Sequence, residues 1–210
     1  EAAHSITCVS NQKQMMQAWM MYFNDYNGIH PGPQWFVPDH PSKAQQYVRW
    51  YATVHVYSGD ANTFAAAQKF GEFNLTRCPS DRTKDGGKRL GRNYGMNGYH
   101  GLARDPPTKV AGAADFRVVS KVKKPSSAYF IGDSINNEYG RDGSSYRAPQ
   151  FCARPSGNDF IHRGMARHKG NSIGNFAMFD GHVESKTATW LIQESYEGRN
   201  SVFFDPKMQF

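Results

Sequence analysis

Histidine and carboxylate residues in the second half of the chain form the one cluster with the chemistry of a metal or catalytic site. Imidazole nitrogens and carboxylate oxygens can bind the same transition-metal ion. The same groups also transfer protons in hydrolases. Their spacing matches no ligand signature such as His-Glu-x-x-His. A metal-dependent hydrolase requires at least three of these side chains to converge within ligand distance. In the alternative, structural interpretation Asp180 forms a turn and His182 faces solvent. The candidates are His162, His168, His182, Asp133 and Asp180.

Two polar segments carry the hard oxygen atoms that Ca²⁺ prefers. They are residues 136–138 (Asn-Asn-Glu) and 142–145 (Asp-Gly-Ser-Ser), and neither has the full EF-hand pattern. A loop without a metal is the alternative interpretation. The sequence therefore commits to no cofactor, and Ca²⁺ remains possible at these two segments.

Four aromatic residues in loop-like segments are candidates for ligand contact. Trp35 and Phe36 follow Pro31 and Pro33, and Tyr139 and Tyr146 lie in the polar segment 136–149. Aromatic side chains that line a groove bind carbohydrate or another protein, but the same residues can also fold back onto the core. The sequence leaves both interpretations open.

The basic charge does not predict a nucleic-acid partner. The net charge is +7, from 25 Lys and Arg residues against 18 Asp and Glu residues. Nucleic-acid-binding proteins concentrate such residues on one face, whereas here only Lys121, Lys123 and Lys124 form a short run. The chain also lacks the run of about 20 apolar residues that a membrane-spanning helix requires.

Residues 2–26 predict one long helix that positions the rest of the chain. The segment contains no glycine or proline, and Asn27-Gly28 ends it. Its apolar stripe is wide enough to pack on a sheet, whereas residues 1–5 are small or polar. A helix that begins at the chain end without a cap suggests a continuation upstream in a longer protein. The apolar positions are Ile6, Val9, Met16, Trp19, Met20, Tyr22, Phe23 and Tyr26.

The remaining elements predict an α+β fold, in which helices pack on one face of an antiparallel meander. Shorter helices are expected at 43–57, 61–70 and 189–197. Asp180-Gly181 is typical of a two-residue hairpin turn with positive φ at both positions. The length favours a single domain, 1–210, with the long helix in 1–27, loops and a helical insertion in 28–72, and the sheet in 73–210. Strands are expected at 92–96, 116–119, 128–132, 175–179 and 182–186.

The three cysteines, Cys8, Cys78 and Cys152, are too few for a disulfide scaffold. Their spacing fits no Cys-x-x-Cys metal site. Three free thiols, or one disulfide with one thiol left over, both remain open from the residues alone.

Several separate segments, taken in order, resemble one family. They are Cys8-Val9-Ser10-Asn11-Gln12-Lys13-Gln14 with Tyr22, Asn24, Asp25, Asn27-Gly28 and Pro31; Cys78-Pro79-Ser80-Asp81; residues 93–99; residues 122–125 with 131–134; and residues 167–168 with 179–183. This set resembles the type II secretion pseudopilin-like proteins, which have a prepilin-type N-terminal cleavage and methylation segment. The last segment resembles the family element named for His, nine residues and Asp-Gly. Here eleven residues separate His168 from Asp180, and the extra length is expected in a loop near 171–174.

The resemblance implies a pilin-like fold and an anchored precursor. In that family the first helix continues upstream as a hydrophobic segment, which holds the precursor in the inner membrane until a prepilin peptidase trims its leader. The helix then packs against other pseudopilin subunits. The chain would thus be a periplasmic or cell-surface ectodomain. The resemblance also implies a Cys8–Cys78 disulfide, with Cys152 free, because both cysteines fall in family motifs and the periplasm permits disulfides.

The resulting functional hypothesis is a non-enzymatic structural and assembly subunit of a type II secretion or pilus-like system. In this hypothesis Asp180 and Gly181 form the hairpin, and Asp133 and His168 are buried polar links between strands, which must then be hydrogen-bonded. One alternative is an extracytoplasmic carbohydrate- or protein-binding module on the same scaffold. The other is the metal-dependent hydrolase described above.

Overall fold

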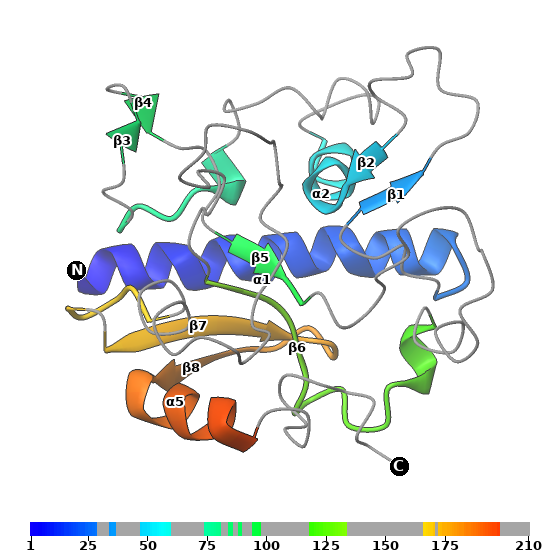
Figure 1. Ribbon diagram of the computed structural model, residues 1–210. Coiled ribbons are helices and arrows are strands. Elements are labelled where there is room, and N and C mark those ends of the chain that lie inside the picture. Colours follow the sequence, from blue (N-terminus) through cyan, green and yellow to red (C-terminus); the bar gives the residue numbers. More distant parts are fainter. Residues whose placement is uncertain are drawn as a thin grey trace.

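The computed structural model has a long N-terminal helix, a four-stranded antiparallel sheet and several short elements (Figure 1). The predicted α+β fold is therefore confirmed. The described residues are 1–28, 34–36, 47–59, 74–80, 84–85, 88–89, 94–97, 118–133, 166–170 and 172–197. The helices are α1 (Ala2–Asp25), α2 (Trp50–Tyr57) and α5 (Ala188–Glu197), with 3-10 turns η2 (Asn74–Thr76) and η5 (Val119–Lys121). The strands are β1 (Gln34–Phe36), β2 (Tyr47–Arg49), β3 (Lys84–Asp85), β4 (Lys88–Arg89), β5 (Tyr94–Met96), β6 (Tyr129–Asp133), β7 (Ile173–Met178) and β8 (Val183–Thr187).

Helix α1 forms the central layer of the molecule. In Figure 1 it runs between α2 on one side and the sheet on the other. Trp19 packs edge-on against Phe130 of β6, with 5.3 Å between the ring centroids. Because apolar residues occur on both of these sides of the helix, α1 connects the α2 layer with the sheet. Its buried residues are Cys8, Gln12, Met15, Met16, Ala18, Trp19, Tyr22 and Phe23.

The predicted apolar stripe of α1 is wrong at its N-terminal end, because Ile6 is 71% exposed. The buried face begins at Cys8, which lies two residues further along the helix and thus about 200° around its axis. Ile6 therefore points to the opposite side. Within the described part of the chain, no helix is both long enough and apolar enough to cross a membrane.

The sheet has the strand order β5-β6-β7-β8, and all three pairings are antiparallel. Successive side chains of a strand face opposite sides. Phe130 and Ala177 accordingly belong to the core shared with α1, whereas Phe176 and Met178 pack with Leu191 of α5. Because β6 and β7 have consecutive apolar residues, both faces of the sheet are apolar there and must be buried by other elements. The prediction that helices cover only one face is therefore wrong.

The segment between α1 and the sheet differs from the prediction. Helix α2 spans only Trp50–Tyr57, because Tyr47–Arg49 forms β2 and pairs with β1. Trp35 and Phe36 thus lie in a strand and not in a loop, while their side chains lie outside what the structure describes. In the described part of the strand expected at 116–119, Val118 is extended as predicted, but the prediction is wrong at Val119, which begins η5. The helix expected at 61–70 lies outside the described residues.

The predicted hairpin joins β7 to β8, but its loop has three residues and not two. Gly181 N–H donates to the Met178 carbonyl at 3.0 Å, and Met178 N–H donates to the His182 carbonyl at 2.8 Å. Only Gly181 has a positive φ in this turn, at 92°. This pattern is a turn followed by a left-handed glycine, which hairpins commonly use. Asp180 accepts a hydrogen bond from His182 N–H at 3.2 Å, and so stabilises the turn.

Candidate functional site

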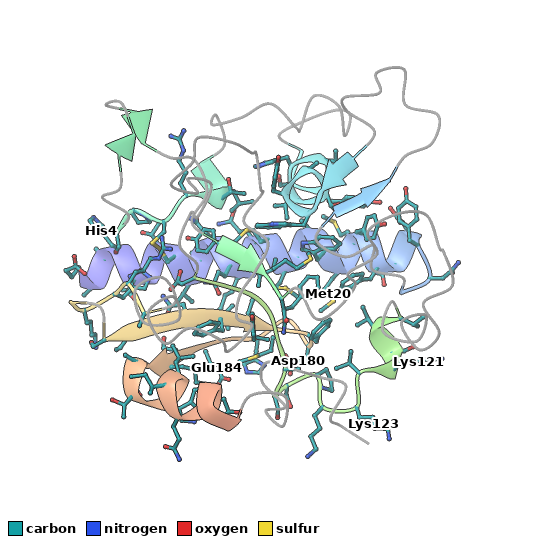
Figure 2. The ribbon with its side chains drawn as sticks, viewed as in Figure 1. His4, Met20, Lys121, Lys123, Asp180 and Glu184 are labelled. Atoms are coloured by element: carbon teal, nitrogen blue, oxygen red, sulfur yellow. A yellow bond between two sulfur atoms is a disulfide. The ribbon has the colours of Figure 1, made fainter. Side chains whose placement is uncertain are left out.

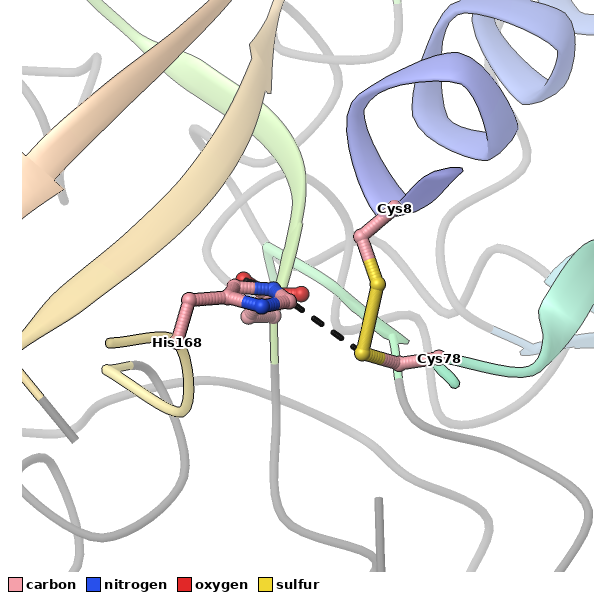
Figure 3. Close-up of side chains that lie close together, drawn as sticks. Cys8, Cys78 and His168 are labelled. Carbon is pink, nitrogen blue, oxygen red and sulfur yellow. Dashed lines mark hydrogen bonds and ion pairs between the residues drawn. A yellow bond between two sulfur atoms is a disulfide. The ribbon is translucent and has the colours of Figure 1, made fainter. Parts of the chain in front are cut away.

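A disulfide between Cys8 and Cys78 joins α1 to the segment that follows η2 (Figure 3). The two Cα atoms are 5.5 Å apart, and the sequence separation is 70 residues. The cysteines have exposed fractions of 0% and 3%. The pairing that the resemblance implied is therefore present, on the buried face of the central helix.

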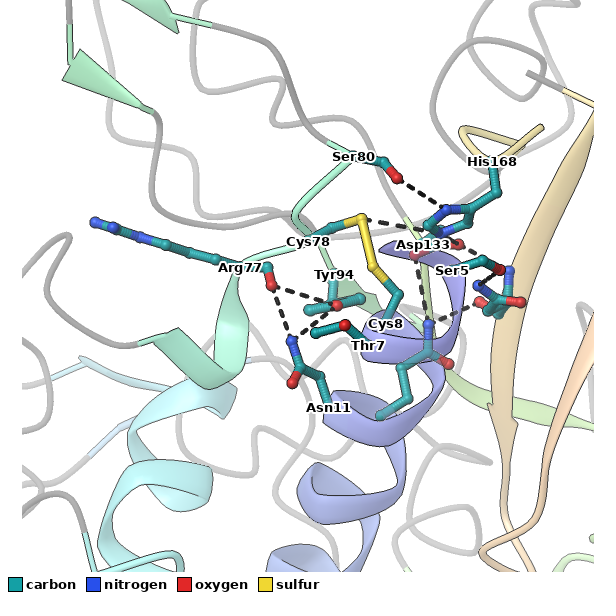
Figure 4. Close-up of a disulfide and its surroundings, with 12 residues drawn as sticks. Ser5, Thr7, Cys8, Asn11, Arg77, Cys78, Ser80, Tyr94, Asp133 and His168 are labelled. Atoms are coloured by element: carbon teal, nitrogen blue, oxygen red, sulfur yellow. Dashed lines mark hydrogen bonds and ion pairs between the residues drawn. A yellow bond between two sulfur atoms is a disulfide. The ribbon is translucent and has the colours of Figure 1, made fainter. Parts of the chain in front are cut away.

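A buried pair of His168 and Asp133 lies directly beside the disulfide (Figure 4). His168 Nε2 is 3.1 Å from Asp133 Oδ2 and 3.8 Å from Cys78 Sγ, and neither member of the pair has any exposed side-chain surface. Asp133 is the last residue of β6. His168 is positioned by a β-bridge to Ile173, which closes a tight turn before β7. The expected longer loop near 171–174 is wrong at 173 and 174, which already lie in β7.

Both ring nitrogens of His168 have polar neighbours. Ser80 Oγ lies 3.1 Å from Nδ1, on the side opposite Asp133. A neutral ring satisfies both contacts when Nε2–H donates to Asp133 and Nδ1 accepts from the serine hydroxyl. The ring is thus held between the Cys78 segment and β6.

Asp133 receives further hydrogen bonds from α1 and β7. Asn175 N–H donates to Oδ2 at 2.8 Å. Gln12 Nε2 donates to the Asn175 carbonyl at 2.9 Å and approaches Asp133 Oδ1 at 3.5 Å. Buried charges are stable only with such partners. The Asp133 carboxylate therefore has the donors that it needs, whereas Gln12 Oε1 has no hydrogen-bond partner among the described residues.

Tyr94 borders the cluster from β5. Asn11 Nδ2 donates to the Arg77 carbonyl at 2.9 Å and to Tyr94 Oη at 3.3 Å. Burial raises the pKa of Tyr94 far above its ordinary value, and the nearby charge of Asp133 raises it further. The phenol therefore stays protonated and donates to the Arg77 carbonyl at 3.5 Å.

We expect Tyr94 to make the fold sensitive to alkali. Since its pKa is higher in the folded chain than in the unfolded chain, its stabilisation is fully present below pH 10 and decreases as the pH rises further. The decrease is about 1.4 kcal/mol per pH unit for one such group. Urea unfolding between about pH 9.5 and 11 should show a shallower loss for Tyr94→Phe than for the unaltered chain. Equal slopes would contradict the assignment.

The structure divides the predicted histidine and carboxylate cluster into two pairs. His182 Nδ1 contacts Asp180 Oδ1 at 2.6 Å on the exposed hairpin, with side chains 43% and 35% exposed. Within the described ranges, the one group of three or more possible metal ligands is Cys8, Cys78, Asp133 and His168. The predicted grouping of His168 with Asp180 and His182 is therefore wrong. The candidates outside the described residues are His162, Tyr139, Tyr146, Cys152 and the two oxygen-rich segments at 136–138 and 142–145.

Sequence reasoning assigned no individual role to Gln12, Ser80 or Asn175. One signal was available for Gln12, since it lies four residues after Cys8 and so shares a helix face with it. A signal was also available for Ser80, because it lies two residues after Cys78 in one of the segments that carry the family resemblance. Asn175 carried no signal, because its role depends on the pairing of β7 with the rest of the sheet.

Ser80, His168 and Asp133 have the residue types of a hydrolase triad, but their arrangement differs. In that triad Nε2 faces the serine, and Nδ1–H donates to the aspartate. Here Nδ1 faces Ser80, while Nε2 faces Asp133 and the Cys78 sulfur. The geometry fits a buried link, or a set of ligands around Nε2, better than a serine nucleophile with its base.

No match is found when the chain is compared with protein-family models, with curated proteins and with solved structures. The family resemblance therefore rests on the ordered segments of the sequence.

Proposed function

We propose that this chain is a non-enzymatic, pseudopilin-like assembly subunit whose head is built around α1. One observation carries the proposal: separate segments of the resemblance converge in space. Cys8, Cys78, Asp133 and His168 come from four of those segments, and their ligand atoms lie within 4.8 Å of one another. In this proposal the four segments therefore share one structural role, which is to hold α1 against the sheet.

The chemistry of the cluster supports a scaffolding role. Catalysis requires that substrate reach a reacting group, whereas Cys8, Asp133 and His168 are fully buried. Hydrogen bonds from Gln12 and Asn175 occupy the carboxylate. The cluster therefore joins α1, β6 and the turn before β7 in the manner of a structural cross-link.

In this proposal α1 has a second role on its exposed side. Ile6 is 71% exposed and Met21 is 46% exposed, so this helix presents apolar contact points to neighbouring subunits. The proposal includes an apolar continuation of α1 in the full-length precursor, which anchors it in the inner membrane. The head then lies in the periplasm or at the cell surface.

Site-specific photo-crosslinking of the full-length protein in its producing cells tests the proposal. A benzophenone amino acid replaces Ile6 in one variant and Lys123 in the control. Lys123 is also exposed, but it follows η5 and points away from α1 (Figure 2). We expect light-dependent adducts between subunits at position 6, in the membrane fraction, and at least a tenfold lower yield at position 123. Recovery of the protein only in the cytoplasm, or equal yields at both positions, would contradict the proposal.

A further inference from the structure

The four side chains around the disulfide have the composition of a zinc site. Two cysteine sulfurs, one imidazole nitrogen and one carboxylate oxygen are all ligands that Zn²⁺ accepts, usually four at a time in a tetrahedron. We propose that the dithiol form of this chain binds one Zn²⁺ ion through Cys8, Cys78, His168 and Asp133. This inference does not depend on the proposed assembly role.

The geometry requires only small movements. Zinc–sulfur distances of about 2.3 Å and zinc–nitrogen distances of about 2.0–2.1 Å place neighbouring ligand atoms about 3.3–3.8 Å apart. The four ligand atoms here already lie within 4.8 Å of one another. They come from α1, the segment after η2, the end of β6 and the turn before β7, so they approach the centre from different directions (Figure 4).

The partners of the ligands match those of a metal site. A histidine that binds metal through one nitrogen usually donates its other N–H to a neighbouring acceptor. His168 directs Nε2 at Cys78 and Asp133, while Ser80 Oγ lies 3.1 Å from Nδ1 and can accept that bond. Asn175 N–H holds the carboxylate of Asp133 in place. These supporting contacts orient both ligands before any metal binds.

The redox state of the two cysteines selects between the metal and the disulfide. A phosphine reductant cleaves the S–S bond to two thiols and becomes the phosphine oxide, with its oxygen taken from water. Zn²⁺ binding then releases the two thiol protons and leaves two zinc–thiolate bonds. A disulfide oxidant removes two electrons from the thiolates, which restores the Cys8–Cys78 bond and frees Zn²⁺. The oxidant is reduced to two thiolates, which take up protons from water. Either cross-link joins α1 to the sheet region.

Cobalt substitution tests the proposal directly. The full chain with Cys152→Ser is reduced by a phosphine without oxygen, freed of reductant and titrated with Co²⁺ and then Zn²⁺. We expect one equivalent of Co²⁺ to bind with sulfur-to-cobalt charge-transfer bands and the visible bands of a tetrahedral site, and Zn²⁺ to displace it. The oxidised chain should show neither set of bands.

Two variants test whether the four residues bind the metal or have only a structural role. Ser80→Ala keeps all four ligands and removes the acceptor at Nδ1, so Zn²⁺ affinity should fall about 10–100-fold. His182→Ala removes an exposed histidine of the other pair and should leave the affinity unchanged. Near-UV circular dichroism reports folding in each sample. Should the reduced chain unfold without metal, recovery of the native spectrum with Co²⁺ supports the proposal. A reduced chain without cobalt bands, whether folded or unfolded, overturns it.

Discussion

We expect the double variant Cys8→Ala/Cys78→Ala to lose about 4 kcal/mol of unfolding free energy. The bridge closes a loop with a sequence separation of 70 residues, and in the chain-entropy model a loop of this length strongly restricts the unfolded chain. The native state also loses the sulfur that contacts His168. Urea unfolding of the variant and of the unaltered chain, both with a metal chelator, measures the difference.

The unaltered chain reduced by a dithiol provides the first control for this prediction. It should lose a similar free energy, because reduction removes the same constraint without changing the side-chain volume. Cys152→Ser provides the second control and should leave the unfolding free energy within about 0.5 kcal/mol of the unaltered value. A loss below about 1 kcal/mol in the double variant would mean that the bridge contributes little to the attachment of α1.

The parts of the fold that local pattern determines could be predicted. Helical periodicity without glycine or proline identified α1, and short apolar runs identified most of β5, β6, β7 and β8. The errors arose where tertiary contacts determine the secondary structure or the burial of a residue. Residues 47–49 have a helical pattern, yet they pair with β1. Ile6 has helical spacing from other apolar residues, yet nothing covers that side of the helix among the described residues.

The candidate site was only partly predictable, because its members are far apart in the sequence. Cys8 and Cys78 were paired through family resemblance and not through their spacing. Asp180 and His182 were grouped with His168 because they are near it in sequence, but the hairpin directs them to the surface. The depth of Asp133 follows from β6, whose five residues are all buried. The identity of the histidine that contacts Asp133 depends on the turn that the His168–Ile173 bridge closes.

Removal of the Asp133 carboxylate should have an effect comparable with loss of the disulfide. We expect Asp133→Ala to lower the unfolding free energy by about 2–6 kcal/mol, because each buried donor left without its acceptor costs about 1–3 kcal/mol. The substitution leaves two buried donors, His168 Nε2–H and Asn175 N–H, without their acceptor, while the Gln12 amide keeps its stronger bond to the Asn175 carbonyl. Urea unfolding near neutral pH measures the loss, with retention of the disulfide checked by thiol titration.

The chain contains its own matched control, since Asp180 and His182 form the same kind of pair on the surface. Asp180→Ala breaks this pair in contact with water, where such interactions contribute about 0–1 kcal/mol. A large difference between the two aspartate variants would show that burial, and not pairing itself, makes Asp133 indispensable. Similar small losses would mean that water replaces the missing carboxylate, and that Asp133 is not the polar centre that joins α1 to the sheet.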